Sequence, residues 1–283
     1  MVINRFAGTL VLGLALLAVP AAAFAAAVPS RIITLSPTAT EDLFAIGAGK
    51  QVIAVDSQSN YPANAPHTKL SAYTPNAEAI AGYKPDLVVI SNDLGGIVRA
   101  LHTLHIKVMM EPAASTLSDT YGQIAQLGKV TGHASSAAAL VTRMRAEIAS
   151  IAASVPHPAT PITVYHELDK TLYSATSKTF IGRIYTLLGL KDIADAATSG
   201  NGYPQLSSEY IVSANPSLIV LADSIYGAQT AAKVAKRPGW QTVTAIAKGH
   251  VLAVSDDIAS RWGPRIVDFM RQVAATVKAV AAS

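Results

Sequence analysis

The side chains best suited to metal or acid–base chemistry are spread along this 283-residue chain. Its seven histidines are His67, His102, His105, His133, His157, His166 and His250. Only His102 and His105 have a spacing, three residues on a predicted helix, that would let two imidazoles share a metal ion; two solvated helix histidines are the plainer interpretation. A second conceivable site would be assembled across a cleft from side chains of distant segments: His67, His166, Glu167 and Asp257.

No catalytic constellation is recognisable. The sequence has no Gly-x-Ser-x-Gly turn, no glycine-rich phosphate loop and no clustered metal-binding motif. The net charge is only +4, and no basic run or aromatic-interleaved basic patch is present. The sequence therefore gives no indication of an enzyme, and nucleic acid is not an expected partner.

Two glutamates occupy equivalent positions in an internal repeat. Glu78 precedes Pro85 by seven residues, and Glu209 precedes Pro216 by the same distance. In both copies a short helix is predicted before the proline and an apolar strand after it. A second pair of segments, residues 43–54 and 184–194, is also alike. The chain therefore consists of two similar halves.

A long amphipathic helix is predicted between the halves, over residues 133–155. Its apolar residues recur every three or four positions, Gly132 precedes it, and Pro156 ends it. Strands are predicted at 31–35, 52–55, 87–90, 106–110, 162–165, 218–222 and 251–254. Since strands alternate with helices, we expect an α/β fold with two Rossmann-like lobes, each with a parallel sheet, joined by one long rigid backbone helix. A ligand cleft would then lie between the lobes.

The predicted organisation has four parts. Residues 1–27 have the features of a signal peptide, because Arg5 precedes an apolar run that ends at Pro20 and small residues follow; a retained membrane anchor is the alternative. Residues 28–132 form the N-terminal lobe, 133–156 the connecting helix and 157–283 the C-terminal lobe. The chain has no cysteine, so a disulfide and a lipid-modified cysteine are both excluded. We expect an exported protein that is soluble in the periplasm or another extracytoplasmic space.

With these features the chain resembles the helical-backbone (class III) periplasmic substrate-binding proteins of ABC importers. Members deliver vitamin B12, ferric siderophores, haem or metal ions to a permease. The resemblance covers residues 30–280 and is greatest to the vitamin B12-binding branch. The motifs that carry it are Asn60-Tyr61-Pro62, Ala72-Tyr73, Tyr203-Pro204-Gln205-Leu206-Ser207, and Asp257 followed by Arg261, Pro264 and Arg265.

The resemblance implies roles for individual residues. Glu78 and Glu209 would dock on arginines of the ABC permease, whereas their other interpretation is a first-turn glutamate favoured by the helix dipole. Ligand-binding positions in the cleft would be Tyr61, Tyr73, Tyr203, Asp257 and Arg261, with Tyr165, Tyr173 and Trp262 as further candidates. The alternatives are packing tyrosines and, for Asp257 and Arg261, a simple salt bridge at a helix start.

The implied function is capture of cobalamin or a related corrinoid, and its delivery to the permease, by a monomer that is not an enzyme and has no cofactor of its own. At two positions where the vitamin B12-binding branch usually has tryptophan, this chain has Tyr73 and Tyr203. A further aromatic residue of the branch would fall within residues 91–93, which contain none. A ferric siderophore or haem, with Tyr73 or His67 as the iron ligand, therefore remains an alternative, and a Zn or Mn ion is a further one.

Overall fold

The computed structural model describes residues 1, 27–197 and 201–283, and the predicted signal peptide lies almost wholly outside this part of the chain. The first lobe contains a parallel four-stranded sheet in the order β2-β1-β3-β4. Its apolar strands are covered by helices, as expected for a parallel sheet. The strands are β1 (Ile32–Leu35), β2 (Val52–Val55), β3 (Leu87–Ile90) and β4 (Val108–Met110).

The second lobe repeats this topology with the order β6-β5-β7-β8. Its strands are β5 (Thr163–Glu167), β6 (Lys191–Asp192), β7 (Leu218–Leu221) and β8 (Val251–Ala253). The central pairs have matching register, since Ile32 lies opposite Leu87 and Val164 opposite Leu218. Both leucines are two residues beyond the repeated proline, so the internal repeat corresponds to two copies of one sheet. Among the strands of the described residues, the two-residue edge strand β6 alone was not predicted.

The helices that carry the repeated glutamates begin in the same way. In α2 (Ala77–Gly82), Asn76 caps the helix by accepting a hydrogen bond from the Ala79 backbone N–H at 2.8 Å. In α7 (Ser208–Ala214), the Ser207 hydroxyl accepts one from the Tyr210 N–H at 3.1 Å. Glu78 and Glu209 therefore occupy the same position in the first turn of two equivalent helices.

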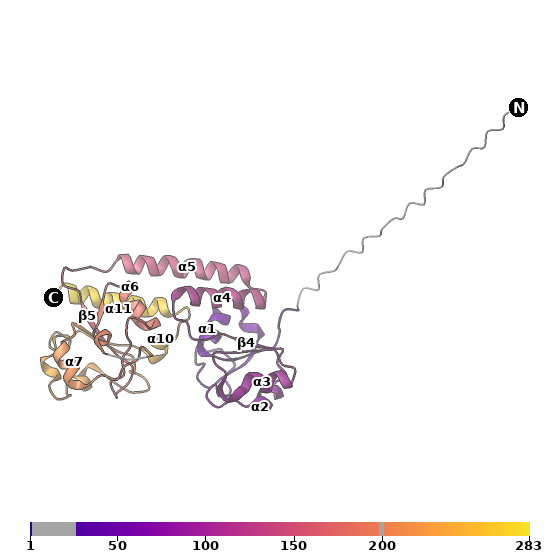
Figure 1. Ribbon diagram of the computed structural model, residues 1–283, viewed down its shortest axis with the longest axis horizontal. Helices are drawn as coiled ribbons and strands as arrows, with labels where there is room; N and C mark the ends of the chain where they lie inside the picture. Colours follow the sequence, from indigo (N-terminus) through magenta and orange to yellow (C-terminus); the bar gives the residue numbers. More distant parts are fainter. Residues whose placement is uncertain (2–26, 198–200) are drawn as a thin grey trace.

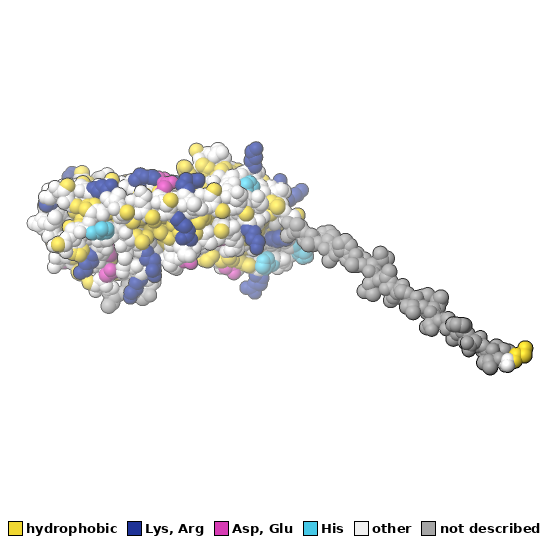
Figure 2. Space-filling model, turned by 90° about the horizontal axis from the view of Figure 1, so that it is seen from above, with side chains coloured by type: hydrophobic (Ala, Val, Ile, Leu, Met, Phe, Trp, Pro, Cys, Tyr) yellow, Lys and Arg dark blue, Asp and Glu magenta, His cyan; other side chains and the backbone are white. Residues whose placement is uncertain are grey.

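Three long helices form a layer over both lobes: α4 (Leu117–Thr131), α5 (Ala134–Ala153) and α11 (Ile266–Ala281) (Figure 1). One hydrophobic cluster extends from Ile32 in β1, through Leu140 in α5, to Phe269 in α11. The lobes are therefore joined by a shared core as well as by the connecting helix. On the face seen in Figure 2, Lys and Arg side chains are scattered among neutral ones and form no basic patch.

The remaining helices are short. In the first lobe they are α1 (Pro37–Ala45) and α3 (Ile97–Thr103), and in the second α6 (Phe180–Leu187), α8 (Ala231–Val234), α9 (Thr244–Ala247) and α10 (Asp256–Ser260). The described part of the chain also contains four 3-10 turns: Ala48–Gln51, Leu94–Gly96, Ile193–Ala196 and Trp240–Thr242. Within the described ranges, no helix has the length and apolar character needed to cross a membrane.

Candidate functional site

A cavity of about 370 Å³ lies between the lobes, where strands of both sheets end. From the first lobe it is lined by residues that follow β1, β2 and β3, including Ser36, Asp56 and Asn92. From the second lobe it is lined by residues after β8, including Asp257. Ligands of parallel α/β sheets bind at the carboxyl ends of the strands, so this cavity is the candidate ligand site.

Four of the predicted site residues line the cavity: Tyr73, Asp257, Arg261 and Trp262. Tyr73 is largely free, with 74% of its surface exposed. Tyr226, which is 62% exposed, lines the same cavity and was missed by the sequence analysis. Its position five residues after the central strand β7 was the available signal, because loops at the carboxyl ends of strands form such sites.

Arg261 is buried at the boundary between the lobes and is fully engaged within the protein. Its Nη1 donates to Glu41 Oε1 at 2.8 Å and to Asn60 Oδ1 at 3.0 Å. Its Nη2 donates to the Gln58 carbonyl at 2.8 Å and to Asp257 Oδ1 at 2.7 Å. The salt bridge considered for Asp257 and Arg261 is therefore present, and three of the four partners of Arg261 belong to the other lobe.

Glu41 is the centre of this contact between lobes. It lies in α1 with 2% of its surface exposed, and Arg265 donates to it through Nε at 2.8 Å and Nη2 at 2.5 Å. The Arg265 guanidinium also stacks over the Tyr61 ring, 4.3 Å from its centroid. Tyr61 therefore contacts the second lobe through Arg265. This ion pair could not be predicted from the sequence, because Glu41 and Arg265 are 224 residues apart.

Of two further predicted residues, Trp262 lines the cavity but is bonded within the protein, and Tyr203 lies outside the cavity. Trp262 donates from Nε1 to Gln123 Oε1 in α4 at 3.0 Å, which adds another contact between the lobes. Tyr203, 37% exposed, lies with Tyr173 in a separate depression of about 640 Å³ on the second lobe. An isolated antiparallel β-bridge between Tyr173 and Gln205 holds the two segments of this depression together.

Tyr165 does not face the cleft, which corrects the expectation that it contacts the ligand. It lies in β5 with 0% of its surface exposed, and its ring packs edge-on against Trp240 at 6.0 Å. Its hydroxyl donates to Glu167 Oε2 at 3.3 Å, and burial raises the pKa of Tyr165. Alternation along the strand turns this side chain into the core of the second lobe.

The histidines do not assemble a metal site in the described part of the chain, where no group of three or more His, Cys, Asp or Glu residues could hold a metal ion. His166 is buried and bonded through Nδ1 to the Tyr185 hydroxyl at 2.6 Å, and burial lowers the pKa of His166 to about 3. Glu167 accepts two hydrogen bonds from Arg237, at 2.5 and 2.6 Å. Both residues are therefore committed to the interior of the second lobe.

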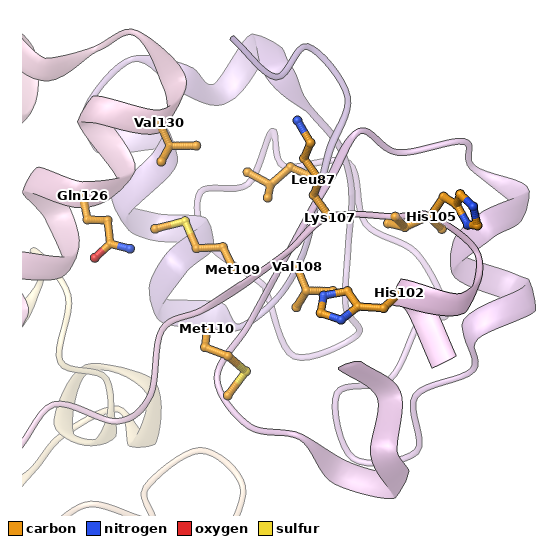
Figure 3. Close-up of a pocket in the computed structure, with 10 residues that line it drawn as sticks. Leu87, His102, His105, Lys107, Val108, Met109, Met110, Gln126 and Val130 are labelled. Carbon is orange, nitrogen blue, oxygen red and sulfur yellow. The ribbon is translucent and has the colours of Figure 1, made fainter. Parts of the chain in front are cut away.

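The alternative in which His102 and His105 share a metal ion from one helix is wrong, because α3 ends at Thr103 and His105 has a positive φ of 60°. Their spacing is consequently not helical. The two rings line a shallow surface pocket with Met109 and Met110 of β4, and they do not face one another (Figure 3).

Two buried carboxyl groups lie near the lobe boundary without complete hydrogen bonding. Burial raises the pKa of Glu111 to about 7. The pKa of Asp42 is also raised, first by burial and then by the charges of Glu41 and Glu111. A side chain at Gly263 of the second lobe would approach Asp42 Oδ1 to 3.4 Å. Since burial favours the neutral form of a carboxyl group, both residues retain their protons to a higher pH than exposed carboxyl groups do.

Two related proteins are similar in sequence to this chain over most of its length. A cobalamin-binding protein of Halobacterium salinarum is 34% identical over 255 residues, which cover 87% of this chain and 69% of the relative. An ABC transporter substrate-binding lipoprotein of Bacillus subtilis, named YvrC and uncharacterised, is 27% identical over 258 residues, 88% of this chain and 80% of its own.

Solved structures share the fold. The periplasmic vitamin B12 binding protein BtuF of Vibrio cholerae superimposes with a TM-score of 0.72 at 24% identity, covering 90% of this chain and 99% of that one. The periplasmic heme-binding protein RhuT of Roseiflexus superimposes with a TM-score of 0.78 at 20% identity, covering 89% and 99%. The sequence profile of the periplasmic binding proteins matches residues 32–257. With two equivalent lobes, a cleft at their strand ends and a long helix between them, this chain belongs to the periplasmic binding protein family.

Proposed function

We propose that the protein captures cobalamin or a related corrinoid between its lobes and delivers it to an ABC permease outside the cytoplasm. The observation that carries the proposal is the composition of the cleft, in which the exposed rings of Tyr73 and Tyr226 accompany hydrogen-bonding groups from both lobes. Flat, stiff aromatic rings suit a large macrocycle, and their hydroxyl groups can bind polar substituents.

The relatives support a corrinoid as the ligand and an ABC importer as the partner. The cobalamin-binding relative shares a third of its residues with this chain over the aligned region. The relative described as an ABC transporter substrate-binding lipoprotein supports delivery to an importer. In this proposal the corrinoid is cargo and the protein needs no cofactor of its own.

The size of the cavity indicates how a macrocycle would bind. At about 370 Å³ the cavity is near the lower end of the range for small-molecule sites, roughly 300–1,000 Å³. A corrinoid would therefore place one edge and its amide groups in the cavity. The rest of the ring system would extend over the exposed tyrosines at the cavity, Tyr73 of the first lobe and Tyr226 of the second.

Haem is the second candidate. The exposed phenol of Tyr73 at the cleft is of a type that ligates ferric iron in haem proteins. A haem-binding protein is also among the structures with the same fold. A ligand screen distinguishes the two candidates.

The test is a thermal-shift and absorbance screen of the mature protein with cyanocobalamin, cobinamide, haemin, ferric siderophores and Zn²⁺. We expect a corrinoid to raise the Tm by about 5–10 °C at a hundredfold excess over Kd. Tyr73→Ala should reduce this shift, whereas Tyr83→Ala, an exposed tyrosine outside the cavity, should not. A shift with haemin alone would transfer the proposal to haem, and a shift with Zn²⁺ alone would contradict both.

A further inference from the structure

A groove runs along the outer edge of the first lobe, between the edge strand β4 and helix α4. Its more enclosed part has a volume of about 800 Å³. A shallower part of about 650 Å³ continues along β4, where Met109 extends toward Gln126 and Val130 of α4 (Figure 3). Leu87, Lys107 and Val130 line both parts. The groove shares no lining residue with the cavity between the lobes, so it is a separate site.

One wall of the groove is the chain segment before β1, in which Val28 and Pro29 line the more enclosed part. Asp86 holds this segment in place. Its Oδ2 accepts from the Ser30 N–H at 2.8 Å, and its Oδ1 accepts from the Arg31 N–H at 3.1 Å. Asp86 is the only acidic residue among the described residues that line the groove. Its carboxylate is thus already used to fix the wall.

Lys107 and Lys129 give the groove a positive charge that the protein does not compensate. Both side chains are exposed, and neither ammonium group has a hydrogen bond or ion pair with any other residue in the described ranges. Ligand sites are typically apolar with a few polar groups that fix the orientation of the ligand. Apolar walls with two free ammonium groups therefore complement a molecule with an apolar chain and a negative head.

The second lobe has a position equivalent to Lys107. In the first sheet the Val88 N–H donates to the Lys107 carbonyl at 2.9 Å, and in the second sheet the Ile219 N–H donates to the His250 carbonyl at 3.0 Å. Val88 and Ile219 both lie three residues beyond the repeated proline. Lys107 and His250 thus stand at the same place beside the two edge strands, β4 and β8.

At this place in the second lobe the chain covers its own edge. His250 is 8% exposed, and the Ser283 hydroxyl lies 3.4 Å from its Nε2. The Ser283 main-chain oxygen accepts from Lys248 Nζ at 3.3 Å. Oxygen atoms therefore occupy this position beside basic side chains, whereas in the first lobe Lys107 is exposed and the space beside it is open.

Two larger occupants fit the groove less well. A strand added to β4 would pair with only three residues, directly after Lys107, and short edge strands flanked by lysine resist such pairing. A second copy of the chain, related by a two-fold axis, would bring the same surface against itself. Lys107 and Lys129 would then face their own equivalents, and like charges oppose association. A small anion meets neither obstacle.

We propose that the groove binds a free long-chain fatty acid in its carboxylate form. The carboxylate lies at Lys107 and Lys129, and the alkyl chain runs past Leu87 and Val130 toward the methionines of β4. The proposal is independent of the corrinoid function, because the groove and the cavity have no lining residue in common.

The test is isothermal titration calorimetry of the mature protein with octanoate, decanoate and dodecanoate below their micellar concentrations. Each methylene group that leaves water should strengthen binding by about two- to fourfold. Decyltrimethylammonium, which has the same alkyl chain as decanoate with the opposite charge, should bind at least about tenfold more weakly. Saturating cyanocobalamin should leave the Kd of dodecanoate unchanged.

The lysines are tested by paired substitutions. Lys107→Gln with Lys129→Gln should raise the Kd of dodecanoate by about tenfold, since two exposed ion pairs are lost. Lys107→Glu with Lys129→Glu should reverse the charge preference, so that decyltrimethylammonium binds more tightly than decanoate. The matched control, Lys236→Gln with Lys278→Gln, removes two exposed lysines outside the groove and should leave the Kd unchanged.

Several outcomes would overturn the proposal. Equal affinities for octanoate and dodecanoate would show that the alkyl chain stays in water. An unchanged Kd in both paired variants would place the carboxylate elsewhere, and loss of dodecanoate binding in the presence of cyanocobalamin would place it in the cavity between the lobes. Absence of dodecanoate binding, together with a doubled mass in light scattering that Val130→Glu restores to that of a monomer, would assign the groove to a second copy of the chain.

Discussion

Buried carboxyl groups at the lobe boundary are stabilised in two different ways. Glu41 accepts hydrogen bonds from two arginines of the second lobe, so its charge is compensated directly. Glu111 has an oxygen without a hydrogen-bond partner, and burial raises its pKa to about 7. Paired charge and retained proton are the two physical solutions for a carboxyl group removed from water.

The raised pKa of Glu111 predicts a pH dependence of stability. Between about pH 4.5 and 7 the unfolded chain has released this proton while the folded chain retains it, so the free energy of unfolding falls as the pH rises. Glu111→Gln removes this loss. The variant should match the parent near pH 4 and exceed it at pH 8 by on the order of 2 kcal/mol, measured by urea unfolding.

A control for this prediction is Glu147→Gln, which changes an exposed partner of Arg271 and should alter stability by less than about 1 kcal/mol at either pH. Equal stability of Glu111→Gln and parent at pH 8 would show that Glu111 is ionised in the folded protein without cost.

At the scale of residues, local motifs predicted some positions and long-range contacts decided the others. The sequence placed Tyr73, Asp257, Arg261 and Trp262 at what proved to be the cavity. It gave the wrong environment for Tyr165, because the face on which a strand residue lies depends on the packing of the whole lobe. The partners of Arg261 could not be predicted, since Glu41 is 220 residues away.

Helices α4 and α5 pack closely at a point where a glycine is required. A Cβ atom on Gly128 of α4 would lie 2.4 Å from the Cβ of Ala137 and 3.2 Å from the His133 carbonyl oxygen. Two backbones that approach this closely leave no space for a methyl group. The position of the connecting helix relative to the first lobe thus depends on this contact.

Gly128→Ala should therefore destabilise the protein by about 1–3 kcal/mol, because the added methyl group overpacks the helix interface. Gly122 lies in the same helix with no atom within 4 Å of its added Cβ. Gly122→Ala should increase stability by about 0.5–1 kcal/mol through helix propensity alone. Denaturant midpoints of the two variants measure the contrast, and similar effects of both would contradict the packing argument.

The long helix followed directly from periodicity, whereas two features of short elements did not. The predicted helix at 133–155 corresponds to α5, Ala134–Ala153, because its apolar repeat is sustained over many turns. The edge strand β6 is only two residues long and owes its existence to pairing with β5. The end of α3 at Thr103 likewise depends on the backbone turn at His105, which side-chain spacing does not report.

At the scale of the molecule, the repeat predicted the arrangement of two equivalent lobes, but the rigidity of that arrangement comes from packing. The helix layer of α4, α5 and α11 lies on one side, and helices α2 and α7 lie at the far ends of the lobes on the other side (Figure 1). Glu78 and Glu209 are exposed there. Two carboxylates held apart on one rigid body can orient a partner with matching basic groups.

The last prediction follows from this separation of cleft and lobe ends. Glu78→Ala combined with Glu209→Ala should leave cyanocobalamin affinity unchanged, because neither residue lines the cavity, and should abolish ATP-driven uptake by the cognate importer in proteoliposomes. The matched control, Glu147→Ala with Asp268→Ala, removes two exposed carboxylates from the helix layer and should preserve uptake. Normal uptake by the first double variant would assign its glutamates to helix stabilisation alone. Loss of ligand affinity in that variant would instead show that the lobe ends participate in binding, so that capture and docking share one surface.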